Sequence, residues 1–210
     1  MGPPLAARFR EAGANVFEAT GPLDDPSKLE DAIRMCPDPE VLLANLAAGP
    51  SPAAVGEIQD EDWNKLFGVM VHPLMKLVRA FAPGMLERGA GKIVAITSAA
   101  RLRGIPGTSA YCAARGAQNA FVRAAGLELA SGNVQFNAIA QNYVHNDDYY
   151  PESLVSTERF QKHLRRNVPL GRLAEPSETA DLALFLASNQ SNFIVGQVVP
   201  FAGGWVTTTG

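Results

Sequence analysis

The sequence lacks the features that mark several specialised classes of protein. Two cysteines, Cys36 and Cys112, are too few for a disulfide scaffold in a chain of 210 residues, and they favour reduced thiols in the cytoplasm. No apolar run is long enough to predict a membrane span. Arg8, Arg10 and Glu11 lie where a signal peptide needs an apolar core. We therefore expect a cytoplasmic protein that has no membrane partner.

The sequence also lacks a large excess of either positive or negative charge. The 18 Lys and Arg residues are dispersed among 21 Asp and Glu residues, which gives a net charge of −3. This balance argues against the clustered basic surface that a nucleic-acid partner needs. His72 and His145 have no partners at metal-ligand spacing, and Asp147 and Asp148 have no further ligands beside them, so we expect no metal site.

Alternating helical and β-type patterns run through the whole chain. With 47% hydrophobic residues, the chain is long enough to bury a sizeable core as one domain over residues 1–210. The alternation predicts an α/β fold, in which a doubly wound parallel sheet lies between two layers of helices. The expected helices span 5–12, 27–35, 60–87, 111–130, 157–167 and 177–188, and the expected strands span 16–18, 41–44, 92–97, 134–140 and 195–201.

Local signals refine two of these helices. Ser27 and Glu30 have the spacing of a capping box, which predicts that the second helix begins at Ser27. The long helix over 60–87 contains His72-Pro73 and Pro83-Gly84, and we expect an interruption at each because proline removes a backbone donor.

The chain opens on a helix, whereas folds of this kind open on a strand and a Gly-rich turn. That strand is normally central, so its loss would expose ladder groups of its neighbour. We expect the first strand to lie upstream of Met1, with the sequence starting about 12–15 residues late at an internal methionine. The alternative is a chain that starts at Met1 and covers the gap by other means.

Polar residues with catalytic chemistry follow the strand over 92–97. Ser98 comes directly after that strand, and ligands in parallel sheets bind beyond the carboxyl ends of the strands. The turn at Gly104–Gly107 returns the chain to a helix on which Tyr111 and Arg115 are four residues apart and share a face. Each residue alone is commonly structural, but together they can converge on one oxygen atom.

The spacing of Ser98 and Tyr111 resembles the Ser and Tyr-x-x-x-Lys arrangement of the short-chain dehydrogenase/reductase superfamily. The resemblance covers nearly the whole chain and implies a Rossmann-like fold. It extends to ANLAAG at Ala44–Gly49, to the segment Pro169–Ser188, and to GQVVPFAGG at Gly196–Gly204.

Three departures from that pattern concern contacts with the nicotinamide cofactor. Arg115 replaces the lysine that binds the ribose, and arginine is a poor proton relay because it stays charged. Met70, seven residues after Trp63, stands where the superfamily has a relay asparagine. Gln141-Asn142-Tyr143 replaces a Pro-Gly pair beside the nicotinamide. Together these departures predict an enzyme that uses no cofactor.

With these departures, the sequence resembles the halohydrin dehalogenases of that superfamily. The resemblance implies that Ser98, Tyr111 and Arg115 form the catalytic triad. It also implies a halide pocket in the segment Asn137–Ser153, the alternative for that segment being a polar surface loop with aromatic anchors. The pocket residues are Gln141, Asn142, Tyr143 and Tyr150, the last of which precedes Pro151, and Ile105 and Thr108 border the substrate.

The implied reaction converts vicinal haloalcohols to epoxides and halide, and in reverse opens epoxides with azide, cyanide, nitrite or halide. Tyr111 takes the proton from the substrate hydroxyl, Ser98 orients the oxygen, and the charge of Arg115 stabilises the phenolate. The resemblance further implies a homotetramer packed through helices. Two alternatives remain, namely an NAD(P)-dependent reductase with an unusual site and a non-catalytic binding or scaffolding member.

Overall fold

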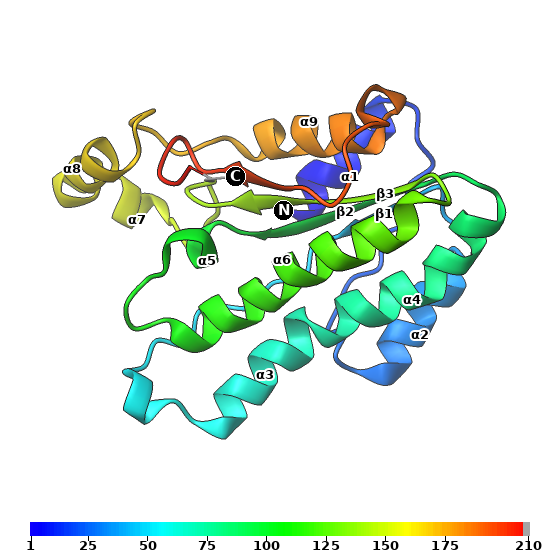
Figure 1. Cartoon of the computed structure of the whole chain (residues 1–210). Helices are drawn as coiled ribbons and strands as arrows, with labels where there is room; N and C mark the ends of the chain where they lie inside the picture. The colour runs from blue at the N-terminus through cyan, green and yellow to red at the C-terminus, as the bar shows by residue number, and fades with distance from the viewer. Residues whose placement is uncertain (208–210) are drawn as a thin grey trace.

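A four-stranded parallel sheet forms the middle layer of the computed structural model, which describes residues 1–207 (Figure 1). The strand order is β1-β2-β3-β4, and each neighbouring pair is parallel. The strands are β1 (Val41–Ala44), β2 (Gly91–Ser98), β3 (Val134–Gln141) and β4 (Val198–Phe201). The predicted fold class is therefore confirmed, and β1 lies at a sheet edge with no further strand beside it among these residues.

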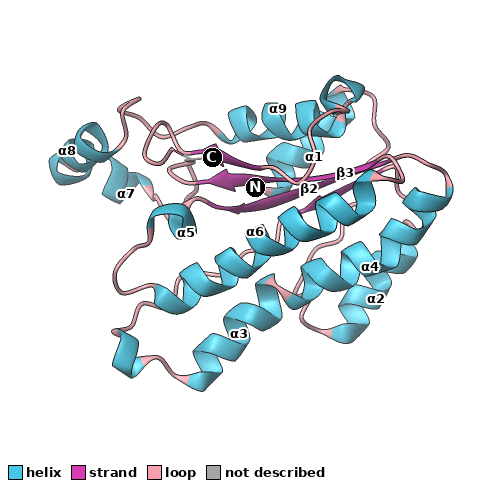
Figure 2. Ribbon diagram, in the orientation of Figure 1, coloured by secondary structure: helices cyan, strands magenta, loops and turns pink. Residues whose placement is uncertain are grey.

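Helices cover both faces of the sheet (Figure 2). One face carries α1 (Gly2–Glu11) and α9 (Pro176–Ala187). The other carries α2 (Pro26–Met35), α3 (Asp60–Met70), α4 (His72–Glu87) and α6 (Ser109–Ala130). The shorter helices are α5 (Ala100–Arg103), α7 (Glu152–Val155) and α8 (Glu158–Asn167), with 3-10 turns η1 (Val55–Glu57) and η2 (Asn189–Ser191).

The central strands and α6 form the core that positions the site. Every residue of β2 is buried, because helices pack on both of its faces. Gly126 lets α6 approach β3 closely. A Cβ at this position would lie 2.8 Å from the Cα of Gly196 and 2.9 Å from the carbonyl oxygen of Phe136. Both contacts are with backbone, which cannot move aside as a flexible side chain can.

The expected strand at Val16–Glu18 is wrong, because these residues form coil and pair with no strand. The carboxylate of Glu18 accepts a hydrogen bond from Arg10 of α1 at 2.5 Å, which ties the segment to a helix instead of to the sheet. Phe17 is half exposed, so the segment buries too little apolar surface to hold a strand in place.

The expected capping box at the start of α2 is also wrong. Asp25 is the N-cap, and its carboxylate accepts hydrogen bonds from the backbone N–H and the hydroxyl of Ser27, both at 2.8 Å. Asp25 accepts a backbone N–H of the first helical turn that has no partner within the helix, so the helix begins one residue before Ser27. Glu30 instead lies 3.5 Å from Arg34 on the same helix.

The helix predicted over 60–87 breaks once, at Val71 between α3 and α4, where Pro73 follows in the first turn of α4. The second expected interruption is wrong, because α4 continues through Pro83. Pro83 is on the exposed side of α4, where water can satisfy the carbonyl that its missing N–H leaves unpaired.

By length and composition alone, Asp60–Glu87 is apolar enough to cross a membrane. Some of its apolar side chains nevertheless pack inside the domain, where Leu66, Met70, Leu74 and Met85 are almost fully buried. These four residues belong to the core-facing side of two helices, which explains part of the apolar character of the stretch.

Candidate functional site

Tyr111 and Arg115 lie together in the first turns of α6, beneath the carboxyl ends of the strands. The Nε of Arg115 donates a hydrogen bond to the Tyr111 hydroxyl oxygen at 3.1 Å. The guanidinium carbon also lies 5.3 Å from the centre of the Tyr111 ring. The structure therefore brings together the tyrosine and the cation that the helical spacing predicted.

Arg115 is a buried cation without a carboxylate partner among residues 1–207. Its side chain is 4% exposed, and none of the described ion pairs includes it. Its Nη1 donates to the carbonyl oxygens of Leu46 at 3.0 Å and Ile96 at 3.4 Å, and to Oε1 of Gln118 at 2.9 Å. Dipoles of neutral groups thus hold the guanidinium, and its positive charge remains uncompensated beside the Tyr111 oxygen.

Ser98 ends β2 and is buried near the same edge of the sheet. Its Oγ accepts a hydrogen bond from the backbone N–H of Ala100 at 3.1 Å, which orients the hydroxyl. A hydroxyl that accepts one bond still has its own proton to donate. No described hydrogen bond joins Ser98 to Tyr111. A substrate oxygen placed between the two hydroxyls could accept a hydrogen bond from each of them.

Ile105 and Thr108 lie on the turn that precedes α6. The Thr108 hydroxyl donates to the carbonyl oxygen of Ile105 at 2.9 Å and lies 3.5 Å from the sulfur of Cys112. Ile105 is 37% exposed. Among the described contacts, none joins either residue to Tyr111, and their substrate-binding role stays a prediction.

The loop after β3 gathers aromatic side chains. The rings of Tyr143 and Tyr150 stack with their centres 6.0 Å apart. Asn142 ties the loop together, because its Oδ1 accepts from the backbone N–H of Tyr143 at 3.0 Å and from the Tyr150 hydroxyl at 3.2 Å. With its oxygen occupied in this way, Asn142 has its side-chain NH₂ left as a donor.

Burial controls the protonation of these phenols. Loss of solvation is the largest cause that raises the pKa of Tyr143 and of Tyr150, and for Tyr150 the pKa lies well above the usual range. The nearby charge of Arg103 lowers the pKa of Tyr143, but only in part. Both phenols therefore stay neutral at physiological pH, and the Tyr150 hydroxyl donates its proton to Asn142.

Gln141 is separated from this aromatic group. Its Oε1 accepts a hydrogen bond from the Thr179 hydroxyl at 3.4 Å, and Thr179 belongs to α9 on the face of the sheet opposite α6. The structure therefore does not bring the Gln141 side chain to Tyr111. Its assignment to a halide pocket stays a prediction and depends on its backbone, which pairs in register with Ser98.

Sequence reasoning missed Tyr149 and His163. The Tyr149 hydroxyl donates to the carbonyl oxygen of Ala48 at 3.0 Å, so this side chain reaches from the β3 loop to the segment after β1. Desolvation raises the pKa of Tyr149, and Tyr111 and Arg115 are near enough to influence it. His163 of α8 lies 2.9 Å from the Tyr143 hydroxyl. Two adjacent tyrosines before a proline were the only available signal for Tyr149, and His163 had none.

Trp205 and Arg103 complete the surroundings of Tyr143. The Trp205 ring meets the Tyr143 ring edge to face with centres 5.8 Å apart. Arg103 lies over Trp205 at 5.2 Å and donates to its carbonyl oxygen at 3.3 Å. Tyr143 itself has φ 56°, a left-handed conformation that is rare for an aromatic residue. Packing on several sides holds this strained backbone in place.

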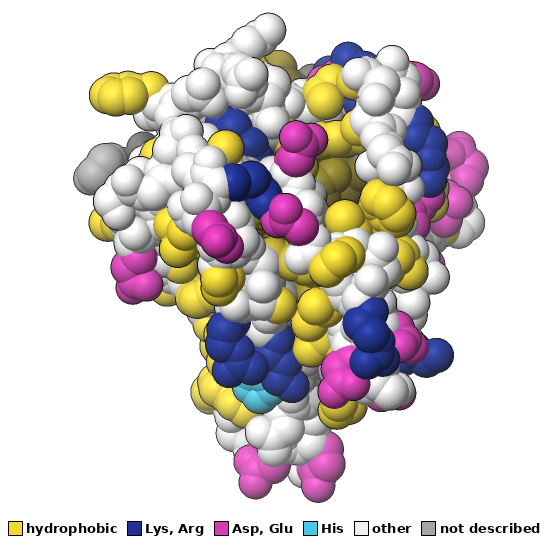
Figure 3. Space-filling model, turned by 90° about the vertical axis from the view of Figure 1, so that its right-hand side faces the viewer, with side chains coloured by type: hydrophobic (Ala, Val, Ile, Leu, Met, Phe, Trp, Pro, Cys, Tyr) yellow, Lys and Arg dark blue, Asp and Glu magenta, His cyan; other side chains and the backbone are white. Residues whose placement is uncertain are grey.

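The described cavities lie beside this site or away from it. A hollow of about 80 Å³ borders Tyr143, Phe201 and Gly203. A larger groove of about 290 Å³ lies between α2 and α4 and contains none of the predicted site residues. Figure 3 shows the side of the molecule where the strands begin, with hydrophobic side chains between basic and acidic groups. The candidate site is at the other end of the strands.

A parallel sheet between two layers of helices, with a strand-end serine and a Tyr–cation pair at the start of α6, defines the class of short-chain dehydrogenase/reductase proteins. A family profile described as Enoyl-(Acyl carrier protein) reductase matches residues 26–206. The chain belongs to this family of the short-chain dehydrogenase/reductase superfamily.

The curated relatives are mainly reductases, and the similar solved structures include both reductases and dehalogenating enzymes. The chain is 34% identical to a 3-oxoacyl-(acyl carrier protein) reductase of Chlamydia muridarum, over 70% of this chain and 58% of the relative. A solved structure titled "Dehalogenation enzyme" is 33% identical, with a TM-score of 0.81 over 97% of this chain and 83% of that chain. A halohydrin dehalogenase bound to ethyl (2S)-oxiran-2-ylacetate is 26% identical, with a TM-score of 0.86 over 100% of this chain and 94% of that chain.

The chain spans about three fifths of the length of the curated reductases it matches. Reductases of the superfamily hold a nicotinamide cofactor, which would have to fit among the described residues of this site. The buried Tyr143 ring, which is stacked on Tyr150, fills the place beside the end of β3. Arg115 stands where reductases have a lysine, and three of its hydrogen bonds go to protein oxygens other than the phenol. These residues do not fit a nicotinamide ring in its usual place.

Proposed function

We propose that the protein is a halohydrin dehalogenase, which converts vicinal haloalcohols to epoxides and halide without a cofactor. The observation that carries the proposal is the buried guanidinium of Arg115, which pairs with no carboxylate of residues 1–207 and whose Nε lies 3.1 Å from the Tyr111 oxygen. A permanent cation in this position favours the phenolate, and a phenolate is a base for the substrate hydroxyl. Likeness to two solved structures that are titled as dehalogenating enzymes supports the same reaction.

The proposed reaction needs no nucleophile from the protein. Tyr111 accepts the proton of the substrate O–H while Ser98 donates a hydrogen bond to the same oxygen. The alkoxide oxygen then attacks the neighbouring carbon, a C–O bond forms, and the C–halogen bond breaks with its electron pair on the halide. Attack within one molecule is fast because the two reacting atoms are already close. In reverse, Tyr111 returns its proton to the epoxide oxygen as an anion attacks carbon.

The leaving halide goes to the aromatic loop after β3 in this proposal. Asn142 has its NH₂ left as a donor, and the neutral rings of Tyr143 and Tyr150 exclude water. The same pocket would accept azide, cyanide or nitrite for epoxide opening. Ile105 and Thr108 are proposed to border the carbon chain of the substrate.

Halide release tests the proposal directly. The protein is incubated with a bromo- or chloro-alcohol without added cofactor, and free halide and epoxide are measured. We expect both products in equal amounts and their loss in Tyr111→Phe, with the thermal unfolding curve unchanged. Halide release by Tyr111→Phe at the parental rate would refute the acid–base role, and an inactive parent chain would refute the function.

A second candidate is an NAD(P)-dependent oxidoreductase, which the curated reductase relatives favour. Titration with NADH and NADPH separates the two functions. Saturable binding with hydride transfer to a carbonyl substrate would support the reductase, and no binding together with halide release would support the dehalogenase. The absence of both activities would favour a non-catalytic member.

We also propose a cytoplasmic homotetramer assembled through the outer faces of α3, α4 and α6. These helices expose large apolar side chains at Trp63, Leu86 and Leu127. A second copy packed against these helices would cover these side chains. Cys36 and Cys112 are free thiols, which fits a reducing compartment.

A further inference from the structure

Gln118 is a buried glutamine about one helical turn beyond Arg115 on α6, and the proposed reaction assigns it no role. Its side chain is 1% exposed, and a buried amide has to pair both its donors and its acceptor. Its Nε2 donates to the carbonyl oxygen of Met70 at 2.8 Å and to that of Leu46 at 3.4 Å. With the nitrogen facing two carbonyls, Oε1 has to face the guanidinium of Arg115, from which it accepts at 2.9 Å.

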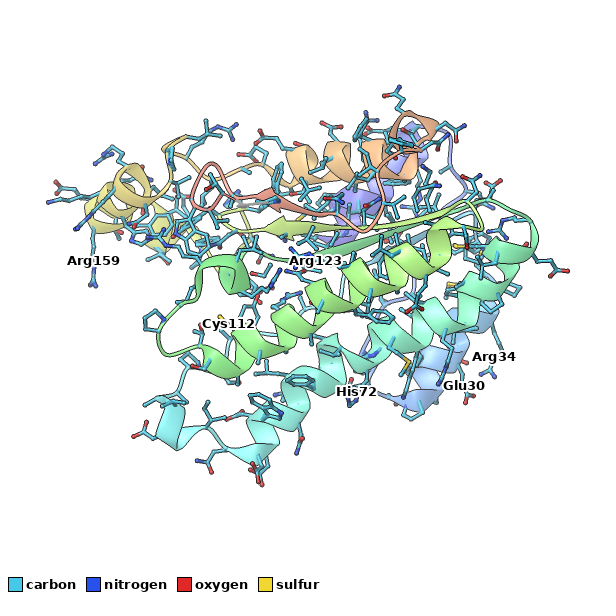
Figure 4. All side chains as sticks on the ribbon, viewed as in Figure 1. Glu30, Arg34, His72, Cys112, Arg123 and Arg159 are labelled. Atoms are coloured by element: carbon cyan, nitrogen blue, oxygen red, sulfur yellow. The ribbon has the colours of Figure 1, made fainter. Side chains whose placement is uncertain are left out.

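These partners come from three separate parts of the fold. Leu46 follows β1, and Met70 is the last residue of α3, immediately before the break at Val71. In Figure 4, His72 marks this junction, and Cys112 marks the start of α6 beside Tyr111. A helix end has carbonyls without intrahelical partners. Gln118 uses one of them, and the break between α3 and α4 thereby fixes the side chain that contacts Arg115.

The neutral charge of Gln118 is what distinguishes it from the usual partner of a buried arginine. A carboxylate at this position would hold the guanidinium as well, but it would offset the positive charge that acts on Tyr111. An amide oxygen holds the same Nη1 and adds no net charge. The other Nη1 acceptors, Leu46 and Ile96, are backbone carbonyls and are equally neutral.

We propose that Gln118 is a positioning residue for Arg115. It fixes the guanidinium so that Nε faces the Tyr111 oxygen, and it leaves the full positive charge to act there. The inference rests on the proposed function, in which Arg115 stabilises the Tyr111 phenolate. It assigns a role to a residue that touches neither substrate nor phenol.

Two substitutions at Gln118 separate orientation from charge. Gln118→Met removes the acceptor, and Gln118→Glu keeps an acceptor of similar size but adds a negative charge. For Gln118→Met we expect kcat to fall about tenfold with KM for the haloalcohol nearly constant, and the pH of half-maximal kcat to rise by about 1 unit. For Gln118→Glu we expect a larger rise, about 2 units, because the carboxylate offsets the charge of Arg115.

Gln135→Met is the matched control. Gln135 is also a buried glutamine, 4% exposed, but it lies near the start of β3 and donates to Asn133 at 3.0 Å. We expect its removal to affect thermal unfolding and to leave the pH profile of halide release unchanged. A shift in this control equal to that of Gln118→Met would mean that any lost buried amide has the same effect, and it would overturn the positioning role.

Phenolate absorbance gives a readout that does not need activity. The parent and each Gln118 variant are titrated with and without the additional change Tyr111→Phe. Subtracting the two absorbance curves of each pair leaves the ionisation of Tyr111. A shift to higher pH in both variants, larger for Gln118→Glu, supports the inference even if the parent chain releases no halide and the proposed function fails. Identical difference titrations in the parent and both variants overturn the inference, whatever the activity.

Discussion

The guanidinium of Arg115 is planar, and acceptors surround it at fixed directions, namely Tyr111 on Nε and three oxygens on Nη1. Lysine keeps the positive charge but presents a single ammonium that cannot meet these acceptors together. For Arg115→Lys we expect halide release to fall about 10- to 100-fold, because charged hydrogen bonds contribute about 1.5–3 kcal/mol each.

The control for this substitution is Arg123→Lys on the same helix, where the side chain is exposed and outside the site (Figure 4). We expect parental halide release from it. Unchanged or faster release by Arg115→Lys would show that charge alone is enough, and the geometric part of the mechanism would then be wrong.

Lys92 is a second buried cation, 7% exposed, at the opposite end of β2. Its Nζ donates to Asn192 at 2.8 Å and to Ser191 at 3.3 Å, and desolvation lowers the pKa of Lys92. Asn192 is exposed, and the Ser191 hydroxyl also contacts backbone carbonyls. For Lys92→Met we therefore expect Tm at neutral pH to rise by roughly 2–4 °C, as for about 1 kcal/mol in a chain of this size.

The pH dependence of this difference has a definite sign. A lowered lysine pKa means that the folded state disfavours the charged form, so the cost is fully present at neutral pH. The cost shrinks as the pH rises from the folded pKa toward the unfolded value of 10.5. The Tm difference between Lys92→Met and the parent should therefore narrow in alkaline buffer. A difference that is constant or wider there would contradict the desolvation argument.

At the scale of one helix, the start of α9 combines a capping box with an ion pair. Glu178 accepts from the backbone N–H of Glu175 at 2.8 Å and pairs with Arg172 at 2.7 Å. The pKa of Glu178 is lowered to about 2. The hydrogen bond from Arg172 is the largest cause, and the hydrogen bond from the backbone of Glu175 is the second. Because the pair is exposed, we expect Glu178→Gln to cost no more than about 1 kcal/mol at pH 7.

This contribution should disappear in acid. The folded pKa is below the unfolded value of 4.5, so the stabilisation is complete above 4.5 and is lost as the pH falls toward 2. Denaturant unfolding at neutral pH and at about pH 2 measures both limits. Glu128→Gln on α6 is the control, since no described ion pair includes Glu128. An equal loss from both substitutions would show that the pair at α9 contributes nothing specific.

Elements with a strong internal pattern could be predicted from the sequence, and their ends could not. The strand that contains Lys92 and the helix that carries Tyr111 lie where the apolar pattern placed them. The start of α2 was assigned to Ser27 because a serine and a glutamate had the right spacing, yet Asp25 competed successfully for the same backbone donors. Which of two neighbouring residues becomes the N-cap depends on the backbone angles, and the order of residues in the sequence does not specify these angles.

The site shows the same division. The spacing of Tyr111 and Arg115 was enough to predict their contact, since it follows from helix geometry alone. The partners of Tyr143 could not be predicted, because His163 is twenty residues away and reaches it only through the packing of α8 against the loop. Gln118 was missed for a related reason, since both of its carbonyl partners belong to other elements.

At the scale of the whole molecule, the outward side of α6 carries small residues up to its last turns. Ala113, Ala117, Ala120 and Ala124 recur at helical spacing, and Leu127, 71% exposed, follows them. Small side chains let a second helix approach closely, and no side chain among residues 1–207 buries the exposed leucine. In the proposed tetramer, α6 of one copy packs through this side against another copy.

A charge on this surface should separate the subunits. We expect the parent to sediment at four times the 22.3 kDa chain mass and Leu127→Glu to sediment as smaller species, because burying an unpaired carboxylate in an apolar interface is costly. Leu170→Glu is the control, since Leu170 is similarly exposed, at 68%, but lies outside these helices. A far-UV spectrum equal to that of the parent would show that Leu127→Glu still folds. A parent that sediments as a monomer, or a Leu127→Glu variant that remains tetrameric, would place the assembly surface elsewhere.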